Sequence, residues 1–442
     1  MTGRYKAYPE YKDSGIEWVG DIPKDWSMWK LAHAFNEIGS GTTPPTSNEE
    51  WFKGDIPWIT TGELREKVIV DTKKKLTKDT LKAFPTLRKY PVGSVAIAMY
   101  GATIGRLGIF GIEATTNQAC CVMTHSKQIN NKYLFYWLWA FKEDIIRLSS
   151  GGGQPNINQE KVASLRVSAP VSKEQQKIAN FLDHETAKID TLITKQEKLI
   201  ELLKEKRQAV IAHAVTKGLN PDAQMKDSGV EWVGKIPASW SMWKLSHAFN
   251  EIGSGTTPPT NNEKWFDGNI HWITTGELRE KVITDTKKKL TEDTLKIFPT
   301  LRKYPVGSIA IAMYGATIGR LGILGVEATT NQACCVMTTS TQLDNNFLFY
   351  WLGAYREEII KLSSGGGQPN INQEKVASLR VSAPLLKEQQ KIVKYLDHEI
   401  AKIDVLTDKQ ELAIKLMKER KTALISAAVT GKIDVRDWQG DA

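Results

Sequence analysis

One long segment of this chain is written twice, and this internal repeat constrains the fold more than any other feature. Residues 13–216 recur as residues 227–430 without a gap, so that Trp18 becomes Trp232 and most paired positions are identical. Solenoid and propeller repeats are much shorter, at roughly 20 to 50 residues. The sequence therefore predicts a duplicated pair of domains related by a pseudo-twofold axis.

The first part of each copy has the pattern of a mixed α/β globule. It is rich in Gly, Pro, Thr and Trp, and its short apolar runs at 56–59, 94–99, 119–123 and 165–167 are separated by turn residues. Such runs are typical of strands. Apolar residues at helical spacing predict one amphipathic helix at 132–148. We expect a twisted sheet with helical cover.

The second part of each copy predicts a long helix with one apolar stripe. It lacks Gly and Pro, and its apolar residues recur at steps of three and four. About 40 helical residues at about 1.5 Å each would span roughly 60 Å. We expect the two helices to pair as an antiparallel coiled coil; the alternative is that each packs back on its own globule. The predicted seam residues are Leu182, Ile189, Leu192, Leu199, Leu203, Leu396, Ile403, Leu406, Met417 and Leu424.

These patterns define the expected architecture. The fold class is mixed α/β, with two globular domains that contain twisted sheets and are separated by two long antiparallel helices. We place the globular domains at 1–170 and 217–384, the helices at 171–216 and 385–430, and a C-terminal tail at 431–442.

The charge balance favours a polyanionic partner. The 442 residues include 59 Lys and Arg against 50 Asp and Glu, a formal net charge of +9, which indicates nucleic acid before a membrane surface. No run approaches the roughly 18 apolar residues of a transmembrane helix, and we see no secretory signal. The four cysteines form two adjacent pairs without the spacing of zinc ligands. We expect reduced thiols in buried strands and a cytoplasmic protein.

Motifs for catalysis are missing from the sequence. The glycine-rich stretches at 39–44 and 101–106 lack the lysine of a phosphate-binding loop and the glycine spacing of a dinucleotide fold. There is no Asn/Asp-Pro-Pro-aromatic motif of amino-group methyltransferases, no convincing carboxylate set for a nuclease metal, and no cluster among the seven histidines. We expect neither a catalytic residue nor a metal ligand in this chain.

Basic, aromatic and amide side chains that recur in both copies are the candidate DNA-binding residues. Lys and Arg suit phosphates, and a few side chains at base edges supply specificity. A tyrosine and an arginine flank the glycine turn at 101–105, a favourable position for base contact. The lysine run is also typical of a solvated surface, and the loop at 149–159 of a simple connector. The candidates are Arg65, Lys73, Lys74, Lys75, Tyr100, Arg106, Gln154, Asn156, Arg279, Lys287, Lys288, Lys289, Tyr314, Arg320, Gln368 and Asn370.

With these motifs the chain resembles the specificity subunit of type I restriction–modification systems. The resemblance covers nearly the whole chain, because every matching motif recurs in the second half. The motifs are GTTP at 41–44, the GATIG turn within 93–105, NQA at 117–119, SGGGQPNIN at 150–158 and, above all, PVSKEQQKIANFLDHETAKID at 170–190.

The resemblance implies two target recognition domains, each reading one half of a bipartite site in double-stranded DNA, and helices that set the unread spacer. It implies a non-catalytic subunit of a DNA adenine methyltransferase and type I site-specific deoxyribonuclease complex. Two methyltransferase subunits would dock on it and use S-adenosylmethionine. Restriction subunits would add ATP- and Mg-dependent translocation and cleavage. This chain is then expected to bind no cofactor and no membrane.

The chain departs from the family pattern in one respect. Specificity subunits commonly carry two dissimilar recognition domains, whereas these two are close copies. Domains related by a pseudo-dyad should read the same half-sequence on opposite strands, so we predict a near-palindromic interrupted site. Two other functions stay open: a protein-interaction scaffold with duplicated globules, and a self-contained methyltransferase or nuclease with divergent motifs.

Overall fold

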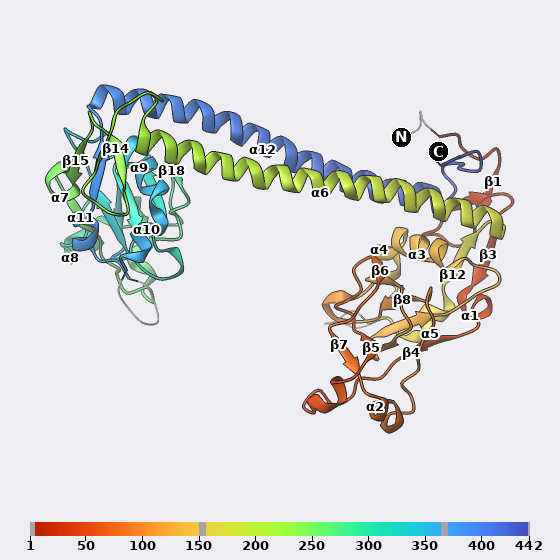
Figure 1. Ribbon diagram of the computed structural model, residues 1–442. Helices are drawn as coiled ribbons and strands as arrows, with labels where there is room; N and C mark the ends of the chain where they lie inside the picture. Colours follow the sequence, from red (N-terminus) through yellow and green to blue (C-terminus); the bar gives the residue numbers. More distant parts are fainter. Residues whose placement is uncertain (1–4, 150–155, 364–369, 441–442) are drawn as a thin grey trace. The chain divides into compact units, whose positions relative to one another are not determined.

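The structure is a computed structural model that describes residues 5–149, 156–363 and 370–440 (Figure 1). The chain forms two compact units. Unit 1 comprises Met1–Glu197 together with Leu412–Ala442, and unit 2 comprises Lys198–Glu411. Each unit contains one globular domain and parts of two long helices, so the predicted mixed α/β class with two sheet-containing domains is confirmed.

The globular domain of unit 1 is made of short strands and helices. Its strands are β1 (Tyr11–Asp13), β2 (Asp21–Pro23), β3 (Ser27–Lys30), β4 (Ile38–Ser40), β5 (Ile56–Ile59), β6 (Lys67–Ile69), β7 (Lys74–Leu76), β8 (Val95–Ala98), β9 (Leu107–Phe110), β10 (Thr115–Thr116), β11 (Cys120–Met123) and β12 (Arg166–Ala169). Its helices are α1 (Leu31–Ala34), α2 (Lys78–Ala83), α3 (Asn131–Ala140), α4 (Lys142–Arg147) and α5 (Gln159–Ser164), with 3₁₀ turns η1 (Glu49–Phe52) and η2 (Gly101–Thr103). The strands at all four predicted positions are present.

A five-stranded sheet in the order β4-β11-β8-β9-β6 forms the centre of this domain. Its neighbours pair antiparallel, except that β6 and β9 run parallel. In β8, Val95 and Ile97 belong to the core cluster that contains α3, whereas Ala96 and Ala98 belong to a second cluster. Because side chains alternate along a strand, burial on both faces explains the continuous apolar sequence. The two adjacent cysteines of β11 are buried and form no disulfide, as predicted.

The helix predicted at 132–148 is in fact two helices. The backbone of Phe141, with φ −99° and ψ 17°, leaves the helical region between α3 and α4. Its ring packs against Trp137 with the ring centroids 4.5 Å apart. The prediction of one continuous helix was therefore wrong, since local periodicity does not reveal a break that is set by core packing.

The globular domain of unit 2 repeats this architecture, with a five-stranded sheet in the order β16-β23-β20-β21-β18. Its strands are β13 (Met225–Asp227), β14 (Lys235–Pro237), β15 (Ser241–Lys244), β16 (Ile252–Ser254), β17 (Ile270–Ile273), β18 (Lys281–Ile283), β19 (Lys288–Leu290), β20 (Ile309–Ala312), β21 (Leu321–Leu324), β22 (Ala328–Thr330), β23 (Cys334–Met337) and β24 (Arg380–Ala383). Its helices are α7 (Leu245–Ala248), α8 (Glu292–Ile297), α9 (Asn345–Ala354), α10 (Arg356–Lys361) and α11 (Gln373–Ser378), with 3₁₀ turns η3 (Glu263–Phe266) and η4 (Gly315–Thr317).

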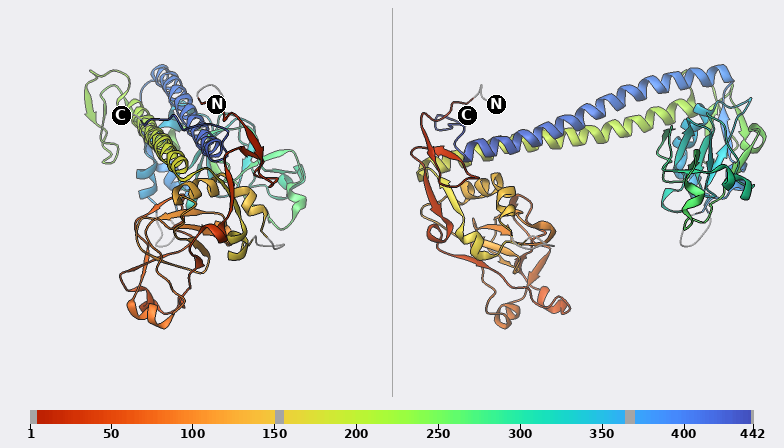
Figure 2. Two further views of the ribbon diagram at one scale, coloured as in Figure 1. Left: turned by 90° about the vertical axis from the view of Figure 1, so that its right-hand side faces the viewer. Right: turned by 180° about the vertical axis from the view of Figure 1, so that it is seen from behind.

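Two long helices, α6 (Ser172–Lys217) and α12 (Leu386–Val429), each contribute one part to unit 1 and the other part to unit 2. In unit 1 the first part of α6 lies beside the last part of α12 (Figure 2), and Asp190 of α6 pairs with Lys421 of α12 at 2.7 Å. In unit 2 the last part of α6 and the first part of α12 enter one core cluster. This exchange of parts makes the helices antiparallel, as predicted. Both also pack on the globular domains.

The seam between the helices differs from the predicted one at three positions. Leu192, Leu199 and Leu406 are 47%, 40% and 45% exposed, whereas Ile193 is buried and Ile200 half-buried. After Ile189 the next buried position is Ile193, four residues on, whereas the predicted seam continued three residues on at Leu192. The predicted leucines therefore face outward. The remaining predicted residues do face inward, with Met417 partly buried and Leu182, Ile189, Leu203, Leu396, Ile403 and Leu424 buried.

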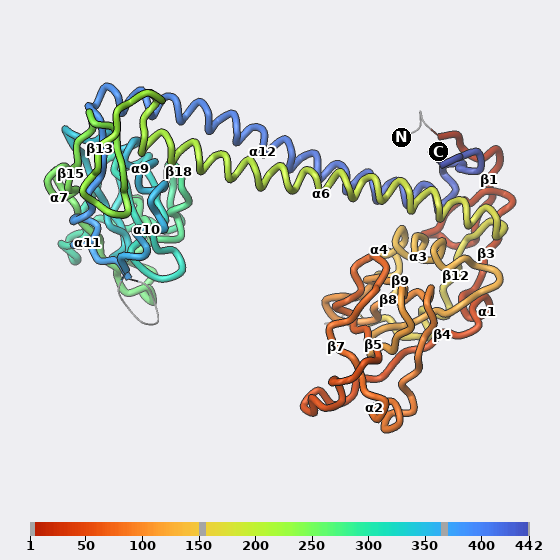
Figure 3. The backbone as a smooth tube through the Cα atoms, viewed as in Figure 1, coloured from red at the N-terminus to blue at the C-terminus, as the bar shows by residue number. Residues whose placement is uncertain are grey.

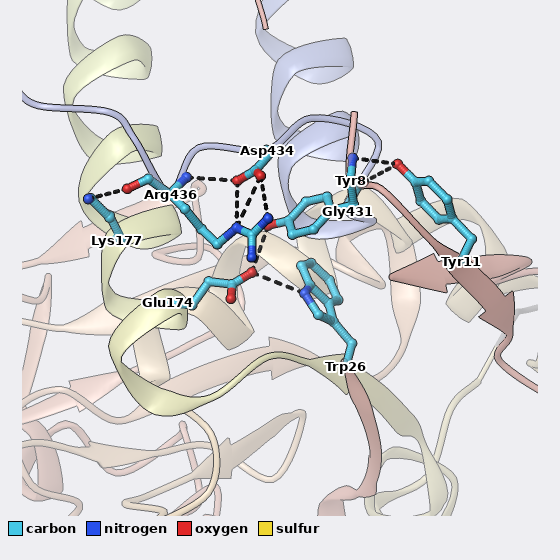
Figure 4. A network of polar contacts seen from close by, with 8 residues as sticks. All are labelled: Tyr8, Tyr11, Trp26, Glu174, Lys177, Gly431, Asp434 and Arg436. Carbon is cyan, nitrogen blue, oxygen red and sulfur yellow. Dashed lines mark hydrogen bonds and ion pairs between the residues drawn. The ribbon is translucent and has the colours of Figure 1, made fainter. Parts of the chain in front are cut away.

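Both ends of the chain belong to unit 1 (Figure 3). Tyr8 Oη donates a hydrogen bond to Glu174 Oε1 at 2.7 Å, and Trp26 Nε1 donates to the same oxygen at 3.1 Å (Figure 4). Arg436 pairs with Asp434 at 2.6 Å and lies 4.9 Å from the Tyr8 ring centroid. Burial and the neighbouring carboxylate raise the pKa of Tyr8. The predicted C-terminal tail is thus integrated into the fold of unit 1.

Candidate nucleic-acid interface

Arg65 and Arg106 line one open depression on unit 1, together with Glu66, Trp139 and Lys142. Arg106 follows η2, and its carbonyl accepts a hydrogen bond at 2.8 Å from the last backbone N–H of β8. The half-buried Arg106 side chain is thus held by a fixed turn between two strands. The fold therefore brings two predicted residues together on a concave surface where cationic side chains outnumber anionic ones.

The backbone at Glu66 is strained. Its φ is 51°, and the corresponding Glu280 of unit 2 has φ 53°. A non-glycine residue pays a steric cost in this region, and such strain clusters at functional sites. Lys142 Nζ lies 3.4 Å from the Glu66 carboxylate, and Arg356 Nη1 lies 3.6 Å from that of Glu280. The sequence analysis missed these pairs because no local spacing relates residues so far apart in the chain.

The lysines of the run at 73–75 lie in different environments. Lys74 Nζ is 4.5 Å from the centroid of the Phe52 ring. Lys75 Nζ pairs with Asp71 at 2.9 Å, and this hydrogen bond lowers the pKa of the Asp71 carboxyl. Lys73 is exposed. Because Lys75 already has a carboxylate partner, Lys73 and Lys74 are better placed to meet a phosphate.

Unit 2 repeats the lysine arrangement with one addition. Lys287 and Lys288 are exposed, and Lys289 pairs with Asp285 at 2.9 Å. The Nδ1 atom of His271, which replaces a proline of the first copy, lies 3.5 Å from the same carboxylate. The two copies thus present similar but not identical basic surfaces.

The predicted tyrosines and asparagines are paired by the backbone. Tyr100 bridges Asn156, and Tyr314 bridges Asn370, each in antiparallel fashion. The asparagines are exposed and the tyrosines half-buried, and burial raises the pKa of both phenols. Amide groups therefore stand beside the glycine turn in both copies. Gln154 and Gln368 lie outside the described residues.

The arginines of unit 2 follow those of unit 1. Arg279 Nε donates to the Gly276 carbonyl at 3.1 Å, as Arg65 Nε does to its own turn at 3.1 Å. Arg279 is exposed and Arg320 is half-buried after η4. The two candidate arginines therefore have the same local settings in both units.

The described part of the chain, through its own side chains and helices, offers neither a cluster of metal ligands nor a membrane-spanning helix. No group of three or more His, Cys, Asp or Glu side chains is arranged there to hold a metal ion. Among the same residues, no helix combines the length and apolar character needed to cross a membrane.

Comparisons with known proteins identify one protein family. The family model of the type I restriction modification DNA specificity domain matches residues 23–202 and 237–416. The type I restriction enzyme MjaVIII specificity subunit of Methanocaldococcus jannaschii is 24% identical over 429 residues, covering 94% of this chain and 95% of its own.

Solved structures share the fold. A chain from a structure concerned with complex assembly and conformational transition of the type I R-M system aligns with a TM-score of 0.73 at 15% identity, covering 92% of this chain and 98% of its own. The HsdS subunit from Thermoanaerobacter tengcongensis aligns with a TM-score of 0.56 at 15% identity, covering 93% and 98% of the two chains.

Proposed function

Because the chain belongs to the type I restriction modification DNA specificity family, we propose that it is the DNA-recognition subunit of a type I restriction–modification complex. The observation that carries this proposal is the presence of the same basic residues at corresponding surface positions of two copied domains. In this function the chain is not catalytic and acts in the cytoplasm. S-adenosylmethionine belongs to methyltransferase subunits, and ATP and Mg to restriction subunits.

The candidate residues divide into two roles. Arg106 and Arg320, each fixed on a turn between strands, suit contacts to base edges, where guanidinium groups pair with guanine. Lys74 and Lys288 lie on exposed strand positions and suit phosphate oxygens. The first role confers specificity, and the second confers affinity that falls with salt.

The two copied domains should read related half-sites. The same elements present the same side chains in each unit, and two such readers related by a pseudo-dyad, as the duplication predicts, would meet opposite strands. The site is then bipartite and near-palindromic, with an unread spacer. The difference at His271 is one of the features that distinguishes the two readers.

The outward-facing leucines supply a surface for partner subunits. On α6 these are Leu192, Leu199 and Leu202, which lie seven and three residues apart on one face of the helix and are each between 40% and 48% exposed. Exposed apolar residues in a row along a helix are typical of a docking face for another amphipathic helix. We place the two methyltransferase subunits against this leucine stripe.

The test is to co-express the chain with its neighbouring methyltransferase gene and to map methylated adenines across a genome by single-molecule sequencing. A split motif with mirror-related halves is expected. A split motif with unlike halves would refute the palindrome and leave the recognition function intact. A stable complex that methylates nothing would favour the interaction scaffold.

Matched variants test the residue roles in the same assay. Arg106→Ala should relax one half of the motif, and Arg320→Ala the mirror-related half, because the two side chains occupy corresponding positions. Each lost bidentate base contact should cost about 1–3 kcal/mol of discrimination. Lys74→Ala should weaken binding to specific and random duplexes alike. Equal losses on both duplexes for Arg106→Ala would contradict its assigned role.

A further inference from the structure

The two copies differ sharply at one position near the end of a domain helix. Trp139 of α3 in unit 1 corresponds to Gly353 of α9 in unit 2. A tryptophan, the largest side chain, is thus replaced by a glycine, which has no side chain, while the surrounding elements are the same in both units. Unit 1 shows what the indole ring contacts, and unit 2 shows the same surface without it.

In unit 1 the Trp139 ring covers a small aromatic surface. It stacks on Tyr136 with the centroids 6.4 Å apart and an interplanar angle of 7°, and packs edge-on against Phe135 at 5.6 Å. Lys421 Nζ of α12 lies 5.0 Å from the Trp139 ring centroid. Under this cover Phe135 and Tyr136 are 4% and 5% exposed.

In unit 2 the corresponding surface is uncovered. Phe349 and Tyr350, the counterparts of the two covered rings, are only half-buried. Arg207 of α6 takes the place of the lysine, and its side chain is 36% exposed against 15% for Lys421. Together with Gly353 these residues line a cavity of about 520 Å³.

The size and opening of this cavity suit a ligand. Small-molecule pockets have volumes of roughly 300–1,000 Å³. A Cβ atom added to Gly353 would meet Leu321 Cδ1 at 3.9 Å, an ordinary van der Waals contact, so the space in front of the glycine accepts a side chain. The matching place in unit 1, lined in part by Trp139, is a more open depression of about 750 Å³.

The two arginines that line the cavity each have a carboxylate nearby, although the buried Nε atom of Arg356 has no hydrogen-bond partner among the described residues. Arg207 Nε lies 3.4 Å from Asp404, and Arg356 Nη1 lies 3.6 Å from Glu280. A charged ligand would have to compete with these partners. A neutral ring can stack on the half-buried aromatic surface of Phe349 and Tyr350 beside Arg207, as the Trp139 indole stacks on Tyr136 in unit 1.

We propose that this cavity of unit 2 binds one small neutral aromatic molecule of the indole class, whose ring takes the position that the Trp139 ring holds in unit 1. The ligand contacts α6 and α9 together and so ties the long helix to the globular domain of unit 2. This inference goes beyond the proposed DNA recognition, and the matching place in unit 1 belongs to the candidate interface there.

Indole itself is the probe, titrated into the full chain by isothermal calorimetry and by ligand-observed NMR. One site per chain is expected in the wild type. Gly353→Trp supplies the missing ring from the chain itself and should weaken binding at least tenfold. Trp139→Gly opens the corresponding place in unit 1 and should raise the stoichiometry to two.

Thermal unfolding gives a second readout, because a ligand that binds only the folded state raises its stability. Indole should raise the unfolding temperature of the wild type and leave that of Gly353→Trp unchanged. The proposal fails if the wild type binds no indole up to its solubility limit, or if Gly353→Trp binds it as well as the wild type. It also fails if Gly353→Trp impairs assembly with a protein partner while the wild type ignores indole, which would assign the cavity to that partner.

Discussion

Adjacent residues of α6 should respond very differently to truncation. Ile193 is 8% exposed within the core of unit 1, whereas Leu192 is 47% exposed. Ile193→Ala removes three carbon groups at about 0.8 kcal/mol each, and the cavity left behind brings the expected loss of unfolding free energy to about 2–4 kcal/mol. Leu192→Ala removes as many carbons, but half of that surface is already in water, so its loss should stay near or below about 1 kcal/mol.

Urea-induced unfolding of the full chain, followed by circular dichroism, measures the difference. With slopes of about 1–3 kcal/mol/M, Ile193→Ala should move the midpoint of the unit 1 transition by about 0.7–4 M. Leu192→Ala should move it little and should instead weaken binding of the methyltransferase subunit. Alanine is the new residue in both variants, so helix propensity hardly enters the comparison. If Leu192→Ala costs as much stability as Ile193→Ala, the assignment of Ile193 to the buried seam and of Leu192 to the exposed face is wrong.

Three further outcomes follow from contacts within unit 1. Tyr8→Phe removes a hydrogen bond of 2.7 Å to the Glu174 carboxylate and should lower the free energy of unfolding by about 1–2 kcal/mol, measured in urea; no loss would show that the contact is not formed in solution. Gly41→Ala places a Cβ atom 1.7 Å from the Thr116 carbonyl oxygen and should cost about 2–4 kcal/mol in the same assay. Burial raises the pKa of Cys121 to about 12, against about 8.5 for a free thiol. The stability that the buried neutral thiol contributes is therefore complete below pH 8.5 and is lost as the pH rises from there towards 12. At pH 8 the folded protein should resist thiol reagents that label the urea-unfolded chain at once.

Much of the fold could be predicted because its determinants are local or repeated. Burial on both faces gives β8 and β11 continuous apolar sequences, and the uninterrupted helical pattern of α6 covers nearly its whole length. The duplication is visible by direct comparison of the two halves. Long-range packing was not predictable in the same way: the break at Phe141 depends on where its ring packs in the core.

The candidate site shows the same division. Arg65 could be chosen from its residue type and its recurrence in the second copy, and Arg106 also from its position beside a turn, but their meeting in one depression depends on the fold. The pair formed by Glu66 and Lys142 depends on a helix that returns to the sheet far along the chain. The sequence comparison of the two copies looked for identical residues, so it did not draw attention to Trp139, which is informative because the second copy has a different residue there.

The misassigned leucines follow from a property of the helices themselves. A helix that pairs with one neighbour needs one apolar stripe, yet α6 carries two: an inner stripe that includes Ile189 and Ile193, and an outer one that includes Leu192 and Leu199. Apolar pattern alone cannot tell which of two adjacent positions faces the neighbour. Since α12 occupies the inner stripe, the outer stripe stays in water unless another chain covers it. Leu192 and Leu199, which were wrongly assigned to the seam, are therefore the residues whose mutation should weaken binding of a methyltransferase subunit and so locate its docking face.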